Sequence, residues 1–153
     1  MCSLPAVEAL RQVWVQQYYT LDETVHWRTD QQGLPALSRF INSPYDVEAR
    51  YARKRSTSWV GYKVHLTETC EDDQPHLIAH VETVLAPSAD GAVTQSIHEG
   101  LKANRLLPNR HLVDAGYMDA PELVTSQQAY NVELVGPARA DYKWQARAAL
   151  PPF

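Results

Sequence analysis

The 153-residue sequence has only two cysteines, Cys2 and Cys70, which form neither a CxxC pair nor a spacing typical of a metal site. A reducing, cytosolic setting is therefore expected. No apolar run approaches the length of about eighteen residues that a membrane-spanning helix needs. The opening residues, MCSLPAVEALRQ, lack the apolar core of a signal peptide. Together these absences predict a cytoplasmic protein with no membrane partner.

Positive charge is not in excess, because 14 Lys and Arg residues stand against 18 Asp and Glu residues and give a formal net charge of −4. This balance argues against a uniformly basic nucleic-acid-binding protein but leaves room for a local basic patch. A glycine-rich phosphate loop and the strand–turn–helix serine motif of hydrolases are also absent. Hydrophobic residues make up 44% of the chain, so a core is possible, and the length suits one ordinary domain.

The hydrophobic pattern predicts a mixed α/β fold. In the first half we expect an amphipathic helix over 5–19, with Val7, Leu10, Trp14 and Tyr18 on one face, and a loop with at most one short helix over 20–46. Strands are expected over 58–71 and 76–86 as an antiparallel hairpin. Along the first strand, apolar residues alternate with more polar ones and form one apolar face, at Val60, Tyr62, Val64 and Leu66.

The second half predicts a β-α-β unit. Asp90 is expected to cap a helix over 91–104, and Asp119 to cap a helix that runs to about Gln128. Short apolar runs at 110–114 and 132–137 predict two strands, which should be parallel with a right-handed crossover. The tail, residues 141–153, is predicted to be irregular.

Asp114, in HLVDAGYMDA (111–120), is the candidate catalytic residue. It follows a short apolar strand, and the carboxyl ends of strands are where open α/β sheets place ligand sites. A carboxylate there could bind a divalent cation such as Mg²⁺. The alternative is a turn aspartate that accepts hydrogen bonds from nearby backbone amides. Spacing alone favours the turn.

A basic stretch, RYARKRSTSWVGYK (50–63), is the second candidate site. It contains five basic residues and no acidic one, interleaved with two tyrosines and a tryptophan. Basic side chains with interspersed aromatics suit contact with a phosphate backbone, although a solvated strand edge is the simpler alternative. The predicted DNA-binding residues are Arg50, Arg53, Lys54, Arg55 and Lys63.

Five blocks in order resemble the middle of bacterial insertion-sequence transposases of the DDE superfamily. They are SPYDVEARYARKR (43–55), WVGYKVHLTETC (59–70), PHLIAHVET (75–83), HLVDAGYMDA (111–120) and VELVGP (132–137). The resemblance implies a ribonuclease-H-like fold in which three carboxylates bind two Mg²⁺ ions and DNA strands are cut and joined. It places the second catalytic aspartate, a metal ligand, at Asp114. This reverses the preference from a turn residue to a metal ligand.

The sequence also departs from that family. No Asp-Ser/Gly-Thr block, which would carry the first aspartate, precedes the hairpin, and Asp46 matches a different family block. The family's catalytic glutamate should lie beyond residue 153. In a ribonuclease-H-like sheet the absent first strand is central, so its loss should leave a gap in the sheet.

The resulting hypothesis is a fragment of a transposase that is inactive alone and has DNA as its partner. An intact transposase or a missing fragment is a second candidate partner. Its expected divisions are a helical segment and linker (1–45), a partial ribonuclease-H-like catalytic core (46–140) and the irregular tail (141–153). Magnesium belongs to the intact family, and no small-molecule substrate is expected. The alternatives are a non-catalytic DNA-binding or transposase-interacting module, and an unrelated small α/β protein with a structural Asp114.

Overall fold

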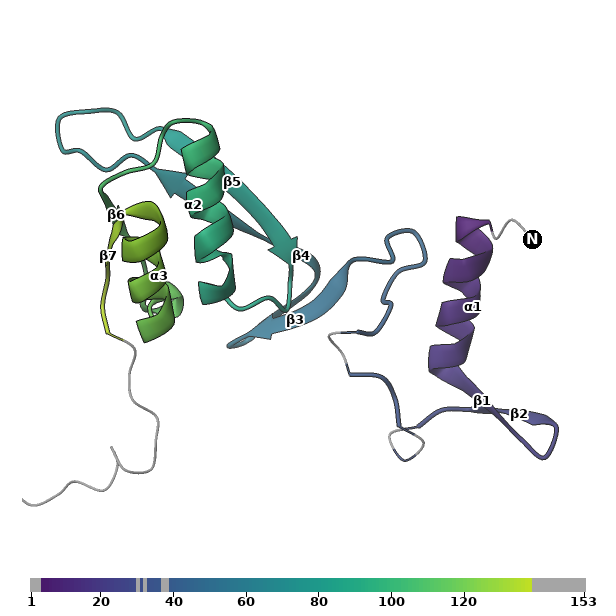
Figure 1. Ribbon diagram of the computed structural model, residues 1–153. Helices are drawn as coiled ribbons and strands as arrows, with labels where there is room; N and C mark the ends of the chain where they lie inside the picture. Colours follow the sequence, from purple (N-terminus) through teal and green to yellow (C-terminus); the bar gives the residue numbers. More distant parts are fainter. Residues whose placement is uncertain (1–3, 30, 32, 37–38, 139–153) are drawn as a thin grey trace, which may run out of the picture. The chain divides into compact units, whose positions relative to one another are not determined.

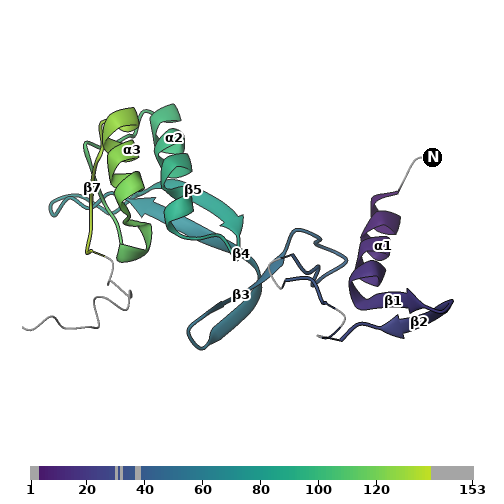
Figure 2. The ribbon, with the colours of Figure 1, turned by 60° about the horizontal axis from the view of Figure 1, so that its bottom comes forward.

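The computed structural model, drawn in Figures 1 and 2, describes residues 4–29, 31, 33–36 and 39–138. Its contacts divide the chain into two compact units. The first comprises Met1–His65 and Thr83–Ser88, and the second comprises Leu66–Glu82 and Ala89–Phe153. Helices and small sheets both occur, as the predicted mixed α/β class requires.

The first unit begins with helix α1, Pro5–Gln17. Proline is tolerated in the first turn of a helix because its missing N–H would have no helical partner there. The expected helix is confirmed, but it ends at Gln17 rather than at residue 19, so Tyr18 is not on its face. Its apolar face is not covered, since Val7, Leu10 and Trp14 are all more than half exposed. The buried residues are instead Ala9 and Gln16.

The expectation of a loop over residues 20–46 is wrong at its beginning, where the chain forms an antiparallel hairpin. Strand β1, Tyr18–Leu21, pairs with β2, Thr24–Trp27. Asp22 and Glu23 turn the chain with positive φ angles of 48° and 61°, the backbone twist of the tightest hairpin turns. Such turns prefer Asn-Gly or Asp-Gly, so Asp-Glu gave no turn signal in the sequence.

A three-stranded sheet has the order β3, β4, β5. Its strands are β3 (Arg50–Lys54), β4 (Thr57–Glu68) and β5 (Ile78–Leu85). The two strands expected over 58–71 and 76–86 are therefore confirmed, as β4 and β5. Strand β3 was not predicted, because its alternating basic and apolar residues resemble a solvated segment.

The apolar face of β4 is the more exposed one. Val60, Val64 and Leu66 have 49%, 56% and 60% of their surface exposed, whereas His65, on the opposite side of the strand, has 5%. Because successive side chains of a strand point to opposite faces, the predicted alternation is correct. The side of the strand that is buried, however, is the more polar one.

The second unit carries the predicted β-α-β unit. Helix α2 (Thr94–Ala103) follows a 3₁₀ turn, η2 (Gly91–Val93), and leads to β6 (Arg110–Leu112). A second 3₁₀ turn, η3 (Ala115–Tyr117), precedes α3 (Ala120–Tyr130) and β7 (Glu133–Val135). β6 and β7 are parallel, as expected. Both views show α2 and α3 side by side (Figures 1 and 2).

The two predicted helix caps have different outcomes. The carboxylate of Asp119 accepts a hydrogen bond from the amide of Glu122 at 2.9 Å, so this cap is confirmed. Asp90 precedes the 3₁₀ turn rather than the α-helix, and its side chain makes no capping hydrogen bond. The prediction for Asp90 is therefore wrong. The predicted tail, 141–153, lies outside the described residues.

Candidate functional site

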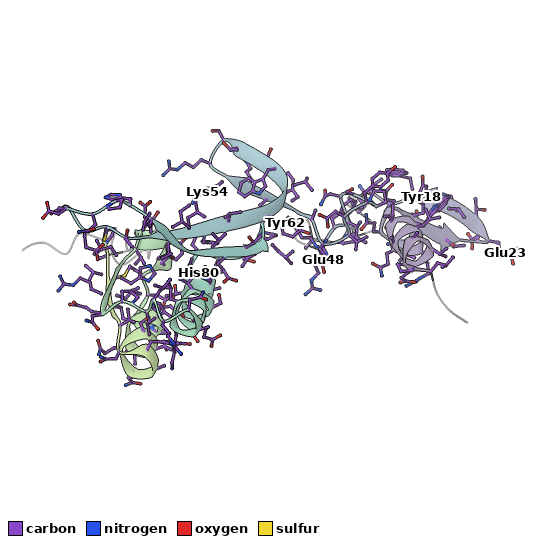
Figure 3. The ribbon with its side chains drawn as sticks, turned by 90° about the horizontal axis from the view of Figure 1, so that it is seen from above. Tyr18, Glu23, Glu48, Lys54, Tyr62 and His80 are labelled. Carbon is purple, nitrogen blue, oxygen red and sulfur yellow. The ribbon has the colours of Figure 1, made fainter. Side chains whose placement is uncertain are left out.

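Three of the five predicted DNA-binding residues occupy the tip of the β3–β4 hairpin. Arg53 pairs with Ser58 and Lys54 with Thr57, and Arg55 turns the chain with a positive φ of 59°. All three are exposed. Figure 3 labels Lys54 and shows its side chain on this hairpin. The tight turn therefore gathers three cationic side chains within three consecutive residues, and this group is called the basic tip below.

Arg50 and Lys63 are engaged elsewhere. The guanidinium of Arg50 donates to the carbonyl oxygens of Val47 and Ala49. The ammonium group of Lys63 donates to the carbonyl of Ser88 at 2.6 Å and is partly buried there. Both side chains are hydrogen-bonded to backbone carbonyls of the first unit, and so is that of Arg53, whose Nε donates to the carbonyl of Arg55 at 3.1 Å.

Asp114 lies two residues beyond the end of β6, because the strand expected over 110–114 ends at Leu112, and it is exposed. Its Oδ1 accepts a hydrogen bond from the amide of Gly116 at 2.6 Å, which caps the 3₁₀ turn η3. This contact is the turn geometry that spacing alone favoured. This hydrogen bond uses Oδ1 of Asp114. It is compatible with binding of a second ligand at the other carboxylate oxygen.

Asp90 is a second carboxylate beside Asp114, and sequence reasoning missed it. A Cβ atom placed on Gly116 would lie 3.1 Å from Oδ2 of Asp90 and 3.5 Å from Oδ1 of Asp114, so both carboxylates border the same small space. The pKa of the nearby Tyr117 is raised by burial and then by the charges of these two aspartates. The two residues lie 24 positions apart in the sequence, so no local pattern could have joined them.

The described residues do not supply a complete metal site. Among residues 4–29, 31, 33–36 and 39–138, no group of three or more His, Cys, Asp or Glu side chains could hold an ion together. Asp90 and Asp114 provide oxygen ligands of the type that Mg²⁺ prefers, but only two of them. Two carboxylates could form part of a metal site. They do not form the three-carboxylate site that the resemblance to DDE transposases implies.

Asp46 has a structural role. The hydroxyl of Tyr62 donates to its two oxygens at 2.9 and 3.1 Å, and the amides of Glu48 and Ala49 donate to Oδ1. The hydrogen bond from Tyr62 is the main reason that the pKa of Asp46 is lowered. This aspartate holds the chain ahead of β3 against β4, which supports leaving it out of the catalytic set.

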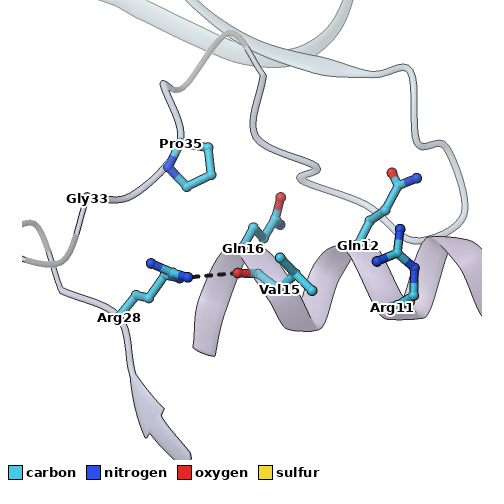
Figure 4. A pocket seen from close by; sticks show the side chains of 7 residues that line it. All are labelled: Arg11, Gln12, Val15, Gln16, Arg28, Gly33 and Pro35. Atoms are coloured by element: carbon cyan, nitrogen blue, oxygen red, sulfur yellow. Dashed lines mark hydrogen bonds between the residues drawn. The ribbon is translucent and has the colours of Figure 1, made fainter. Parts of the chain in front are cut away.

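A pocket with a volume of about 330 Å³ lies beside α1. Figure 4 shows the side chains that line it. Its polar side chains are already paired: Arg28 donates to the carbonyls of Val15 and Tyr18, and Gln16 exchanges two hydrogen bonds with the backbone of Ile41. The pocket therefore offers a small ligand few convergent polar groups, which specific binding sites need.

In comparisons with protein-family models, with curated proteins and with solved structures, nothing matched the chain. In the part of the chain that the structure describes, no helix has both the length and the apolar character needed to cross a membrane.

Proposed function

We propose that the chain is part of a DDE transposase and that it binds DNA through the basic tip without cutting DNA by itself. The observation that carries this proposal is the exposed position of Arg53, Lys54 and Arg55 at the turn between β3 and β4. Cations at a projecting turn can approach phosphates without moving the sheet, and phosphate contacts supply most of the sequence-independent affinity for DNA.

The five ordered sequence blocks support the transposase part of the proposal. Asp114 follows a strand that is parallel to its neighbour, which is the position that the resemblance predicts for a catalytic aspartate. The two parallel strands with a helix between them also suit part of a ribonuclease-H-like sheet. In the proposed whole protein, Asp114 would hold Mg²⁺ together with carboxylates outside this chain, and the metal would stabilise charge during phosphodiester cleavage.

The proposed inactivity of the isolated chain rests on the number of carboxylates that lie together near Asp114 in the part of the chain that the structure describes. Clamping both the attacking and the leaving oxygen takes two ions about 4 Å apart, and Asp90 with Asp114 cannot surround two ions. Magnesium-dependent cleavage or joining of DNA by the purified chain would contradict the proposal.

DNA binding is tested by fluorescence anisotropy with labelled duplex DNA at several salt concentrations. Replacing Arg53, Lys54 and Arg55 together by alanine should weaken binding and reduce the slope of log affinity against log salt by up to about 3, one for each lost phosphate contact. The control is the triple glutamine variant of Lys102, Arg105 and Arg110, which changes net charge by the same amount in the second unit. Equal losses in both variants would show only a general charge effect and would contradict the proposed site.

A non-catalytic DNA-binding module is the second candidate, and the engaged Asp114 carboxylate favours it. The two candidates differ in what Asp114 does when the missing carboxylates are supplied. Adding the rest of an intact transposase of this type should restore cleavage to wild-type chain but not to Asp114→Asn if the chain is a catalytic fragment. For a binding module, neither chain gains activity.

A further inference from the structure

The β1–β2 hairpin of the first unit forms a sheet of only two strands. Among the described residues no third strand pairs with it, and all four residues of β2 are exposed. Figure 3 labels Tyr18 and Glu23, which lie at the start of β1 and at the turn of this hairpin. A hairpin of two strands is marginally stable in water, whereas three or more strands with an apolar face are stable. An added strand would therefore stabilise this hairpin.

The register shows which backbone groups of β2 point away from β1. Along an antiparallel pair of strands, hydrogen-bonded pairs of residues alternate with non-hydrogen-bonded pairs. The amide of Arg28 donates to the carbonyl of Gln17 at 2.8 Å, so these two residues form a hydrogen-bonded pair. Counted back along the register, Val25 and Trp27 lie in the non-hydrogen-bonded pairs. Their backbone N–H and C=O groups therefore face outward, at the edge of the sheet.

The outer edge of β1 is already occupied where the strand begins. The amide of Tyr18 donates to the carbonyl of Trp14 in α1, and its carbonyl accepts a hydrogen bond from the guanidinium of Arg28 at 3.1 Å. The edge of β2 is therefore the one at which another strand can pair. An open edge of this kind is a template for a second extended chain.

An apolar surface reaches this edge. The ring centroids of Trp14 and Tyr18 are 4.7 Å apart, and those of Tyr18 and Trp27 are 5.1 Å apart. Val25 lies on the same face as Trp27, because side chains two residues apart along a strand share a face. Val25 and Trp27 are 59% and 60% exposed. The edge thus offers both backbone groups and uncovered apolar side chains, the two features by which a sheet edge binds an added strand.

The charges around β2 favour a second copy of the same strand as the occupant. Asp22 and Glu23 precede the strand, and Arg28 follows it. Two such strands in antiparallel alignment place the acidic end of each beside the basic end of the other, and no like charges lie opposite each other. The edge is therefore complementary to itself, as a two-fold symmetric interface requires. The two acidic residues disfavour a phosphate backbone at this edge.

We propose that two copies of this chain associate by antiparallel pairing of their β2 strands, which joins the two hairpins into one sheet. Val25 lies opposite the partner's Trp27, and Trp27 lies opposite the partner's Val25. Each of these pairs exchanges two backbone hydrogen bonds. A shift of the register by two residues would pair one of the two residues with itself and place the other opposite a residue outside β2.

The side chains add to the pairing. On the face that carries Trp14 and Tyr18, each Trp27 packs beside the partner's Val25 and covers apolar surface that is exposed in the single chain. The interface is small, so the dimer is weak and its population depends on protein concentration. This inference goes beyond DNA binding and does not involve the basic tip, so the two can fail separately.

The first test is sedimentation equilibrium of the full chain from about 1 to 500 µM. The average mass should rise with concentration from that of one chain towards that of two. Amide exchange of the ¹⁵N-labelled chain, followed by NMR, should slow several-fold at Val25 and Trp27 in the concentrated sample. A single-chain mass across the whole range would overturn the proposal, as would a dimer that leaves exchange at these two amides unchanged.

A matched pair of proline variants locates the interface. Val25 and Thr20 lie directly opposite each other in the hairpin, both are exposed, and both amides point out of the sheet. Proline is tolerated at such edge positions but removes the amide donor. Val25→Pro should weaken the dimer at least about tenfold, whereas Thr20→Pro, on the outer edge of β1, should leave it unchanged. Equal effects of the two variants would contradict pairing at β2.

Near-ultraviolet circular dichroism of the stacked aromatic rings shows whether the hairpin survives each substitution. If proline disrupts the hairpin, Val25→Glu and Thr20→Glu replace the proline pair, because both side chains are exposed and both variants gain the same charge. Only Val25→Glu buries that charge against the partner's Trp27, so it alone should weaken the dimer at least about tenfold. Wild-type dimerisation of Val25→Glu would overturn the proposal, whatever the result of the DNA-binding experiment.

Discussion

Nε2 of His98 lies 3.1 Å from Nδ1 of His111, and this hydrogen bond joins the buried side of α2 to β6. His98 is fully buried, and its Nδ1 has no hydrogen-bond partner. A buried N–H without an acceptor is costly, so Nε2 of His98 should carry the proton and donate it to His111. The ring of Tyr130 packs 5.3 Å from that of His98, and its hydroxyl donates to Glu99. The only cation of α2 near this cluster, Lys102, lies over the ring of Tyr130.

This histidine pair predicts loss of stability in acid. Burial and the neighbouring His111 lower the pKa of His98 to about 4, and burial lowers the pKa of His111. The unfolded chain takes up protons near pH 6.5, so it binds more protons than the folded chain between about pH 6.5 and 4. The free energy of unfolding should fall across that window by about 3 kcal/mol, and it should change little with pH above it. Urea denaturation against pH measures this.

The control for this pH dependence is His98→Gln, which removes the titrating group. Its stability at pH 7.5 should be lower because the buried pair is broken, but its decline between pH 6.5 and 4 should be shallower. A decline as steep as that of the wild type would assign the acid sensitivity to other groups.

Asp119 should contribute to stability as a helix cap. Its carboxylate satisfies the amide of Glu122 at the start of α3. Asp119→Ala should lower the free energy of unfolding by about 1 kcal/mol, whereas Asp119→Asn, which can still accept this hydrogen bond, should change it little. Urea denaturation at pH 7 compares the two, and equal losses would mean that the cap geometry is not the cause.

Substitutions at Asp114 separate its turn contact from its charge. Asp114→Ala removes the acceptor for the amide of Gly116 and should cost about 1 kcal/mol. Asp114→Asn keeps an acceptor and removes repulsion from the nearby Asp90, so stability should hold or rise. Chemical denaturation of the two variants provides the comparison. A loss in Asp114→Asn as large as in Asp114→Ala would mean that the negative charge itself stabilises the turn.

Gly136 should not tolerate a larger residue. A Cβ atom there would lie 2.3 Å from the backbone oxygen of Val113, and Val113 donates its amide to Val135 alongside. Because backbone atoms cannot rotate away as a side chain can, Gly136→Ala should destabilise the chain by about 1 to 3 kcal/mol. Thermal denaturation measures the loss. An unchanged melting temperature would show that β6 and β7 can separate without cost at this point.

The sequence alone predicted the elements that have strong local signals. The period of apolar residues and the proline in the first turn predicted α1, and Asp119 with Pro121 predicted the start of α3. The short apolar runs around His111 and Leu134 predicted the parallel strands β6 and β7. It missed β1, β2 and β3, because their turns lack the usual glycine or asparagine and their strands lack a clear apolar face.

Only the tertiary structure decided how the candidate groups combine. It placed the consecutive residues Arg53, Lys54 and Arg55 at an exposed hairpin turn, and it directed Arg50 and Lys63 to backbone carbonyls. It brought Asp90 to Asp114 and His98 to His111, pairs whose members come from different elements. Local pattern fixes the conformation of a segment because neighbouring residues share one backbone. Contacts between segments depend on packing, and no local spacing in one sequence records them.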